Sequence, residues 1–152
     1  MDWTPCVSDE LGFAFLKPPL WEEVDGGPAG SLIVVAPPSG DAFRSNFNVV
    51  VRQLDELPTP EEFAQYQIGN LERMLTDFQL LDLEDCTVAG APATRMLCTH
   101  RQGVYPLTLE QWWVLADGGY AVCSATAESL QYPDVASTFS RIVASFGSVS
   151  DD

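Results

Sequence analysis

The sequence is poor in basic residues and in the side chains that most catalytic and metal sites need. Of its 152 residues, seven are lysine or arginine and one is histidine (His100), against 22 aspartates and glutamates, so the formal net charge is −15 at pH 7. Such a surface repels phosphate backbones and anionic lipids, and we expect neither nucleic acid nor stable membrane association. The charge serves solubility, or it gives a repulsive exterior to a protein that handles an apolar or basic client. Charge alone does not separate these two interpretations.

Long apolar runs are missing as well. None approaches the roughly 20 residues that span a bilayer, and the N-terminal stretch MDWTPCVSDE has neither the basic nor the apolar region of a signal peptide. We therefore expect a cytoplasmic protein, although a leader trimmed from the sequence would leave the same pattern. The cysteines are scattered without a C-x-x-C pair, which favours reduced and buried thiols (Cys6, Cys86, Cys98 and Cys123).

The motifs of the common catalytic and metal sites are also missing. Cys98 and His100 share one strand face, but two ligands fall short of the three or four that zinc requires. There is no G-x-S-x-G elbow for a serine nucleophile and no glycine-rich phosphate loop. We therefore expect no catalytic residue, no metal site and no cofactor. Carboxylates are nevertheless numerous enough that counting does not exclude a glycosidase-like pair.

What is present describes one folded domain, residues 1–148, with a polar tail at 149–152. Hydrophobic residues make up 46% of the chain and aromatic residues 11%, which is ample for a core. Strand patterns precede and follow a helix pattern, and a second helix pattern closes the chain. This order predicts an α+β fold in which an antiparallel sheet is flanked by two main helices. The strand patterns lie in 11–24, 31–38, 46–54, 79–88, 91–100, 107–116 and 120–127, and the helix patterns lie in 57–78 and 132–146.

The first helix pattern has a clear beginning. Thr59 and Glu62 form a capping-box pair, and Pro60 suits the first helical position. Gly69 weakens this helix, or it permits the close approach of another backbone. The residues at helical spacing form an apolar row that contains two amides (Phe63, Gln67, Asn70, Leu71, Met74, Leu75 and Phe78).

Several strands are apolar on both faces, and the stretch LEQWWVL shows this most clearly. Successive strand residues point to opposite faces, so Trp112 and Trp113 lie on opposite sides, with Gln111 beside Trp113. Both faces then need cover. Either the two helices take opposite faces and all the rings are core, or both helices pack on one face and leave the other for a partner. The pattern alone leaves both alternatives open.

Segments spread over nearly the whole chain carry a resemblance to a known family: PPLWEE at the end of an N-terminal strand, EEFAQYQIGNLERML, TVAGAPATRML, LEQWWVL and YPDVASTFSRIVASF. In this order they resemble the DcrB/PsbP-like family, whose fold is shared with the Ran-binding Mog protein. The branch most similar to this chain is the Eag-type chaperones of type VI secretion, which shield apolar transmembrane segments near the effector N-terminus. The resemblance implies a non-catalytic, cytoplasmic, homodimeric chaperone or adaptor whose partner is a secreted effector.

The resemblance also implies a groove in which client helices contact apolar strand residues and two polar side chains. The apolar pair matches Leu32 and Val34, and the glutamine of the L-x-Q strand matches Gln111. The polar helix position matches Asn70, where an Eag chaperone has glutamine, so the amide arm is shorter here by one methylene. Trp113, on the face of Gln111, completes the predicted client-binding set.

Gln111 has a physical role in this hypothesis. The ends of a client helix carry backbone groups without partners, and a buried amide can both donate to them and accept from them. A glutamine bonded within its own sheet is the alternative. At the level of function, the alternative is a stand-alone or lipoprotein-type domain of the same fold with an unknown ligand. A hydrolase that uses His100 is the third hypothesis.

Overall fold

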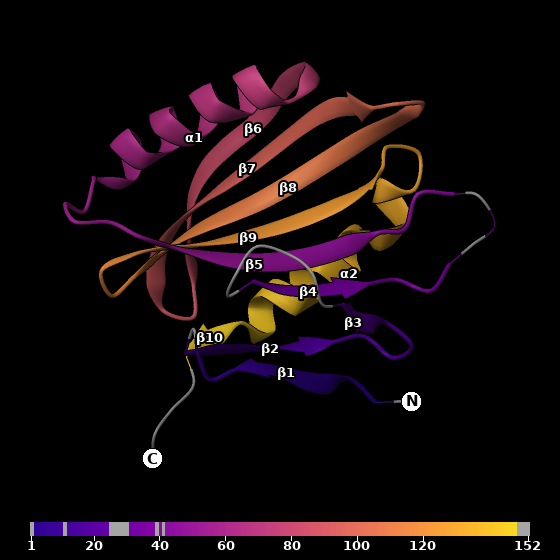
Figure 1. Ribbon diagram of the computed structural model, residues 1–152, viewed down its shortest axis with the longest axis horizontal. Coiled ribbons are helices and arrows are strands. Elements are labelled where there is room, and N and C mark those ends of the chain that lie inside the picture. The colour runs from indigo at the N-terminus through magenta and orange to yellow at the C-terminus, as the bar shows by residue number, and fades with distance from the viewer. Residues whose placement is uncertain (1, 11, 25–30, 39, 41, 149–152) are drawn as a thin grey trace.

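The structure is a computed structural model that describes residues 2–10, 12–24, 31–38, 40 and 42–148. The elements follow one another as shown in Figure 1, and most of the expected strands and both helices are present. Two short strands at the ends of the chain, β1 and β10, were not predicted. The bounds are β1 Thr4–Ser8, β2 Phe13–Lys17, β3 Glu22–Val24, β4 Leu32–Val35, β5 Asn46–Gln53, α1 Pro60–Met74, β6 Thr76–Val88, β7 Ala91–Gln102, β8 Tyr105–Ala116, β9 Gly119–Glu128, α2 Tyr132–Ser145 and β10 Gly147–Ser148.

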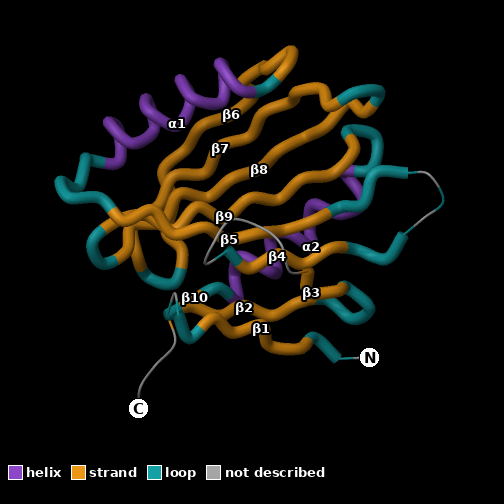
Figure 2. The backbone as a smooth tube through the Cα atoms, viewed as in Figure 1, coloured by secondary structure: helices purple, strands orange, loops and turns teal. Residues whose placement is uncertain are grey.

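The strands form two antiparallel sheets (Figure 2). The larger sheet has seven strands in the order β3-β4-β5-β9-β8-β7-β6, and the smaller has three in the order β1-β2-β10. The last four long strands, β6 to β9, form an antiparallel meander, and β5 joins it by pairing with β9. The α+β class with an antiparallel sheet and two helices is confirmed.

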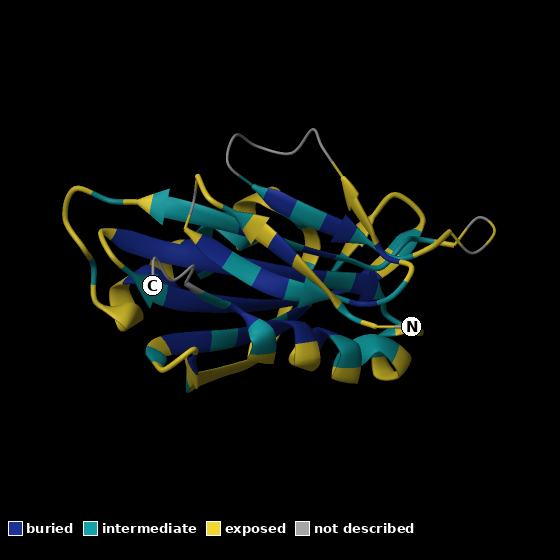
Figure 3. Ribbon diagram, turned by 90° about the horizontal axis from the view of Figure 1, so that it is seen from below, coloured by how far each residue is buried: buried dark blue, intermediate teal, exposed yellow. Residues whose placement is uncertain are grey.

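The two helices cover opposite faces of the larger sheet. Phe63 of α1 meets Trp113 edge to face, with ring centroids 6.1 Å apart, in a core that also holds Tyr120 and Met96. Trp112 lies in the other core, with buried residues of α2. In Figure 1, α2 passes behind β4 and β5, and in Figure 3 its exposed residues lie on the side away from the strands. The alternative in which both helices pack on one face is therefore wrong.

Two elements cover the α2-side face: helix α2 and the β1–β2 hairpin. The Phe15 ring meets the Phe47 ring edge to face with centroids 5.1 Å apart, and the Trp21 ring meets Phe139 at 6.3 Å. Phe47 and Val34 are fully buried between these layers. The apolar residues of the last helix form its inner row, since Phe139, Ile142, Val143 and Phe146 are buried and Val135 is partly buried.

Helix α1 begins where the sequence predicts and ends earlier. Glu62 N–H donates to Thr59 Oγ1 at 3.2 Å, and Thr59 N–H donates to Glu62 Oε1 at 2.9 Å, which confirms the capping box. The helix was expected to run to residue 78, but it ends at Met74, and β6 starts at Thr76. Leu75 is already extended and Asp77 has a left-handed φ of 57°, so the apolar residues that continue the helical spacing belong to a strand.

An ionic network that is buried at Glu110 and exposed at β6 closes the β6–β8 part of the α2-side face. Arg95 Nε donates to the carboxylate of Glu110, which is 2% exposed, and Tyr132 Oη donates to the same carboxylate at 2.8 Å. Arg95 also meets Asp82 at 3.1 Å and Glu84 at 3.3 Å. Burial, and then the bond to Glu110, raises the pKa of Tyr132 to about 12. Two acidic residues of the β6 edge are thus partners of one arginine.

Within the described ranges, neither helix has both the length and the apolar character needed to cross a bilayer.

Candidate binding groove beside helix α1

The five predicted client-binding residues do not lie in one groove. Leu32 is 8% exposed and Val34 is 0% exposed, and both belong to the α2-side core. Trp113 is 1% exposed in the α1-side core. Gln111 lies on the α1 side, and Asn70 lies on α1 itself. A single surface that joins Leu32 and Val34 to Gln111 is therefore excluded.

Strand register shows which early-strand residues share the face of Gln111. Gln111 is opposite Ser124, Ser124 is opposite Asn48, and Asn48 is opposite Ile33. Cross-strand neighbours point to the same side, so the Ile33 side chain points toward α1. Val35, two residues further along β4, points to the same side. Both are only half-buried. The predicted pair, Leu32 and Val34, is therefore shifted by one residue from the pair that faces α1, Ile33 and Val35.

A groove opens on this face between α1 and strands β5, β9 and β8. We call it the amide groove, and its volume is about 240 Å³. That volume accommodates a few side chains, so a whole helix would also have to rest on the neighbouring strand surface. The lining combines apolar side chains with amides and one arginine: Val50, Arg52, Gln67, Asn70, Leu71, Met74, Gln111, Val122 and Ser124.

Gln111 is bonded within its own sheet and retains bonding capacity. Its Oε1 accepts from Trp113 Nε1 at 2.8 Å, and its Nε2 donates to Ser124 Oγ at 2.9 Å. A primary amide has two N–H donors and two acceptor lone pairs, so one of each remains. The two explanations of this glutamine are therefore compatible: it orients Trp113, and it lines the amide groove.

Gln67 is the second amide of the groove. The family resemblance had assigned the polar helix position to Asn70 instead. Gln67 is 7% exposed, and its side chain has no hydrogen bond to any described residue. Among the described residues, every side-chain nitrogen or oxygen that is fully enclosed has a hydrogen-bond partner. The Gln67 amide has none and therefore reaches solvent through the groove that it lines. Asn70 instead accepts a hydrogen bond from Arg73 Nη2.

The rim of the groove carries a cluster of polar and cationic side chains. The Arg52 guanidinium carbon lies 6.0 Å from the centroid of the Tyr66 ring. Hydrogen bonding to Asn70, and then the hydrogen bond and charge of Arg52, lower the pKa of Tyr66. Arg52 thus connects β5 to α1 across one end of the groove.

The thiol and imidazole noted in the sequence do not form a reactive pair. Burial raises the pKa of Cys98 to about 12 and lowers the pKa of His100. Among the residues described here, no three histidine, cysteine or acidic side chains lie close enough together to hold a metal ion. No described feature assigns hydrolytic chemistry to His100.

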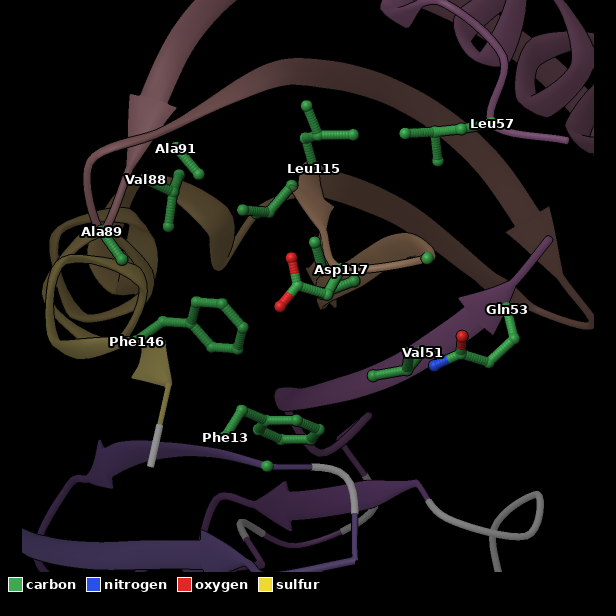
Figure 4. Close-up of a pocket in the computed structure, with 15 residues that line it drawn as sticks. Phe13, Val51, Gln53, Leu57, Val88, Ala89, Ala91, Leu115, Asp117 and Phe146 are labelled. Atoms are coloured by element: carbon green, nitrogen blue, oxygen red, sulfur yellow. The ribbon is translucent and has the colours of Figure 1, made fainter. Parts of the chain in front are cut away.

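A second, larger space lies at the end of the sheet and was not predicted. This end cavity has a volume of about 740 Å³ and lies between the β8–β9 turn, the β6–β7 turn and the start of β2. Figure 4 shows the rings of Phe13 and Phe146 on one side, Leu115 on the other and the Asp117 carboxylate between them. Its wall combines apolar side chains with this carboxylate and the amide of Gln53.

Comparison with solved structures identifies the fold. LpqN, involved in cell envelope biogenesis of Mycobacterium tuberculosis, superimposes with a TM-score of 0.70 over 95% of this chain and 89% of its own, at 18% identity. The cyanobacterial PsbP of Synechocystis gives 0.69 over 96% and 92%, at 14% identity. The Ran-binding protein Mog1p of Saccharomyces cerevisiae gives 0.67 over 99% and 97%, at 13% identity. The chain has the PsbP and Mog1 fold.

These likenesses extend over nearly the full length of both partners, so this fold accounts for the whole described chain. A Pseudomonas aeruginosa protein of unknown function, PA94, matches equally well, with a TM-score of 0.69 at 18% identity over 93% of this chain and 94% of its own. No family model and no curated protein matches the sequence. At these identities the comparisons establish the fold, and the function has to be argued from the site.

Proposed function

We propose that this protein is a non-catalytic, cytoplasmic chaperone or adaptor that holds an apolar, transmembrane-type helix of a secreted effector against the amide groove, as in type VI secretion. The observation that carries the proposal is Gln67, a nearly buried amide that has no hydrogen bond to a described residue and faces a groove that also contains Gln111. Solvent in the groove can bond this amide in the free protein. A ligand that displaces the solvent must therefore pair with the amide, because leaving it unpaired in the complex would cost about 1 to 3 kcal/mol.

The surface around the groove supports an elongated apolar ligand. Helix α1 covers the β7–β9 part of its face, while the neighbouring Ile33, Val35 and Val50 stay half-buried. Met74, at the mouth of the groove, is 78% exposed. Apolar strand side chains with a few fixed amides suit a helix that has an apolar flank and unpaired backbone groups at its end.

The test is binding of a defined probe. A soluble carrier protein would display a 14-residue Leu–Ala helix between Gly–Ser linkers, and affinity would be measured by biolayer interferometry. Val50→Asp places a charge in the apolar surface, and we expect the affinity to fall at least about tenfold. Gln67→Leu removes the unpaired amide, and we expect a loss of about five- to tenfold if that amide pairs with the helix end.

Two matched controls separate groove effects from general ones. Val104→Asp makes the same change at a side chain that is 81% exposed in the β7–β8 turn, and Gln65→Leu makes the same change at an exposed position of α1. Both should bind the probe as the parent does, and circular dichroism at the assay temperature should show that all four variants are folded. Equal affinities for Val50→Asp and Val104→Asp would refute the groove.

We also propose that two copies associate through β6. This is an edge strand of the larger sheet, 13 residues long, and it exposes Leu80, Leu81 and Leu83 by 43%, 56% and 42%. An edge with unpaired backbone groups and exposed leucines favours pairing with another chain. Light scattering coupled to gel filtration should show a dimer that Leu81→Lys converts to a monomer. A monomeric parent protein would contradict this part of the proposal.

The end cavity favours a second function, a domain that binds a small apolar ligand. Its volume of about 740 Å³ falls within the usual range for ligand sites, roughly 300 to 1,000 Å³. Native mass spectrometry of the protein purified from its host would detect a retained ligand. Ala91→Trp, which fills the cavity from its wall, should abolish the additional mass. A mass equal to that of the bare chain in both proteins would reject this function.

A further inference from the structure

The amide groove differs in charge from the rest of the molecule. The chain has 22 acidic and seven basic residues, yet the nine residues that line the groove include one cation, Arg52, and no carboxylate. Neither Arg52 nor its neighbour on the rim, Arg73, is paired with a carboxylate among the described residues. Arg73 donates to Asn70, and Arg52 lies over the Tyr66 ring. This end of the groove is therefore positive and holds N–H donors without ionic partners.

The other end of the same face is negative. Arg52 and Asn46 lie on the α1 side of β5, six residues apart, which corresponds to about 20 Å along a strand. The register places Glu22 in the row of Asn46, since Glu22 is opposite Val35 and Val35 is opposite Asn46. Glu128 lies two residues past Thr126, which is opposite Asn46 on β9. Glu22 meets Arg44 at 3.5 Å, and Glu128 has no ion pair within the described ranges. Two carboxylates and one guanidinium leave this end with a net negative charge.

We infer that the helix bound in the groove lies parallel to β5, with its C-terminal end at Arg52 and its N-terminal end near Glu128. A helix carries about half a positive charge at its N-terminus and half a negative charge at its C-terminus, which matches the two ends of the face. The last carbonyls of a helix need donors, and a guanidinium has only donors. About 20 Å accommodates roughly 13 helical residues. The inference rests on the proposed function and adds the direction of the client.

The experiment is a double-mutant cycle with the same carrier-borne Leu–Ala helix. One charge, Glu or Lys, is placed either immediately after the last helical residue or immediately before the first. Each probe is measured on the parent protein and on Arg52→Glu, so that the probe's own helicity cancels. For probes whose charge follows the helix, we expect Arg52→Glu to change the ratio of the Glu-probe affinity to the Lys-probe affinity by about three- to tenfold. The change should favour the Lys probe. The ratio should be unchanged when the charge precedes the helix.

Two controls protect the interpretation. Arg101→Glu makes the same change at an exposed arginine of β7 whose partner is Asp77, and it should leave every ratio unchanged. Arg52→Gln removes the charge without reversing it and should give about half of the logarithmic change. If Arg52→Glu does not fold, this variant still decides the question. The folds are compared by circular dichroism.

The outcomes separate the inference from the proposed function. If Arg52 couples to the charge before the helix and not to the charge after it, the client helix lies in the opposite direction and the inference is wrong. Probes that bind the parent protein but show no coupling to Arg52 overturn the inference and leave the chaperone function intact. Probes that bind neither protein refute the proposed function, and the inference with it.

Discussion

The two faces of the larger sheet share the same strands and differ in how they are covered. The α2-side face lies under a helix and a hairpin, and its centre is made of rings and aliphatic side chains such as Phe15, Phe47 and Phe139. The α1-side face lies under one helix, which leaves Val50 and Ile33 half-buried. Its polar groups include Gln67, Gln111 and Ser124, each less than 10% exposed.

Under the proposed function, the two faces have separate tasks. A doubly covered apolar layer contributes most of the burial free energy, at about 25 cal/mol per Å² of apolar surface removed from water. A half-covered layer with near-buried amides contributes less, and it keeps surface for a ligand. Sites that bind are commonly the less stable parts of a fold. In this hypothesis, the face that contributes most to stability and the face that binds lie on opposite sides of the larger sheet.

The largest expected effect compares two residues of one strand. Phe47 and Val50 lie on β5 and face the α2 side and the α1 side. Phe47→Ala should reduce the free energy of unfolding by about 3 to 5 kcal/mol, since it leaves a cavity against Phe15. Val50→Ala should cost about 1 kcal/mol, since its side chain is only half-buried. Urea titration followed by circular dichroism measures both, and equal losses would remove the distinction between the faces.

Thiol reactivity gives the next largest effect. Cys98 lies under α1 and Cys123 lies in the α2-side core, and both are 0% exposed. Burial raises the pKa of both thiols. If α1 opens more easily than the opposite cover, iodoacetamide should label Cys98 at least about tenfold faster, which corresponds to 1.4 kcal/mol in opening free energy. Peptide mass spectrometry over time gives the two rates.

Half-buried Cys86 serves as an internal reference for the reagent and should react before either. Labelling of Cys123 ahead of Cys98 would show that the α2-side cover is the weaker one.

A smaller effect is expected from strengthening α1. A Cβ added at Gly69 would meet only Arg73 Nη1, at 3.8 Å, which is an ordinary contact. The interpretation of this glycine as a point of close backbone approach is therefore wrong. Gly69→Ala should raise the free energy of unfolding by about 0.5 to 1 kcal/mol. It should also slow the labelling of Cys98 while leaving Cys123 unchanged. A loss of stability in urea would contradict the open geometry at this position.

The smallest effect is a pH dependence carried by His100 on β7. Burial lowers its pKa in the folded state, so as the pH falls below about 6.5 the unfolded chain takes up the proton first. Folding stability attributable to this residue is therefore present above pH 6.5 and is lost as the pH falls toward the folded pKa. His100→Gln should make the decline in melting temperature between pH 7.5 and pH 5.5 shallower. An identical decline in both proteins would show that His100 does not contribute.

Much of the fold was predictable because local chemistry and global architecture agree. Thr59, Pro60 and Glu62 specify the start of α1. The Asp117-Gly118 pair is a typical hairpin sequence because such turns need positive φ, and Gly118 with φ 74° joins β8 to β9. The end of α1 was missed because Leu75 and Phe78 continue a helical spacing that the strand geometry of β6 overrides. Strand β1 was missed because its five residues include a proline, which is uncommon within strands.

The candidate site was predictable only in part. Gln111 could be found from its place beside two tryptophans and from the resemblance. The side of β4 could not, since Leu32, Ile33, Val34 and Val35 are all apolar and only pairing with β5 fixes which two face α1. On α1, Gln67 and Asn70 both lie in the apolar row, and tertiary contacts decide that Gln67 is the buried one.

The bond between Trp113 Nε1 and Gln111 Oε1 has a practical consequence. It joins an indole chromophore to a side chain that lines the groove, so an occupant that repositions the Gln111 amide also alters the environment of that indole. Under the proposed function, this indole is an optical reporter of occupancy. Of the four tryptophans, Trp3, Trp21 and Trp112 pack on the α2 side. Replacing them with phenylalanine would leave an emission signal from the groove alone.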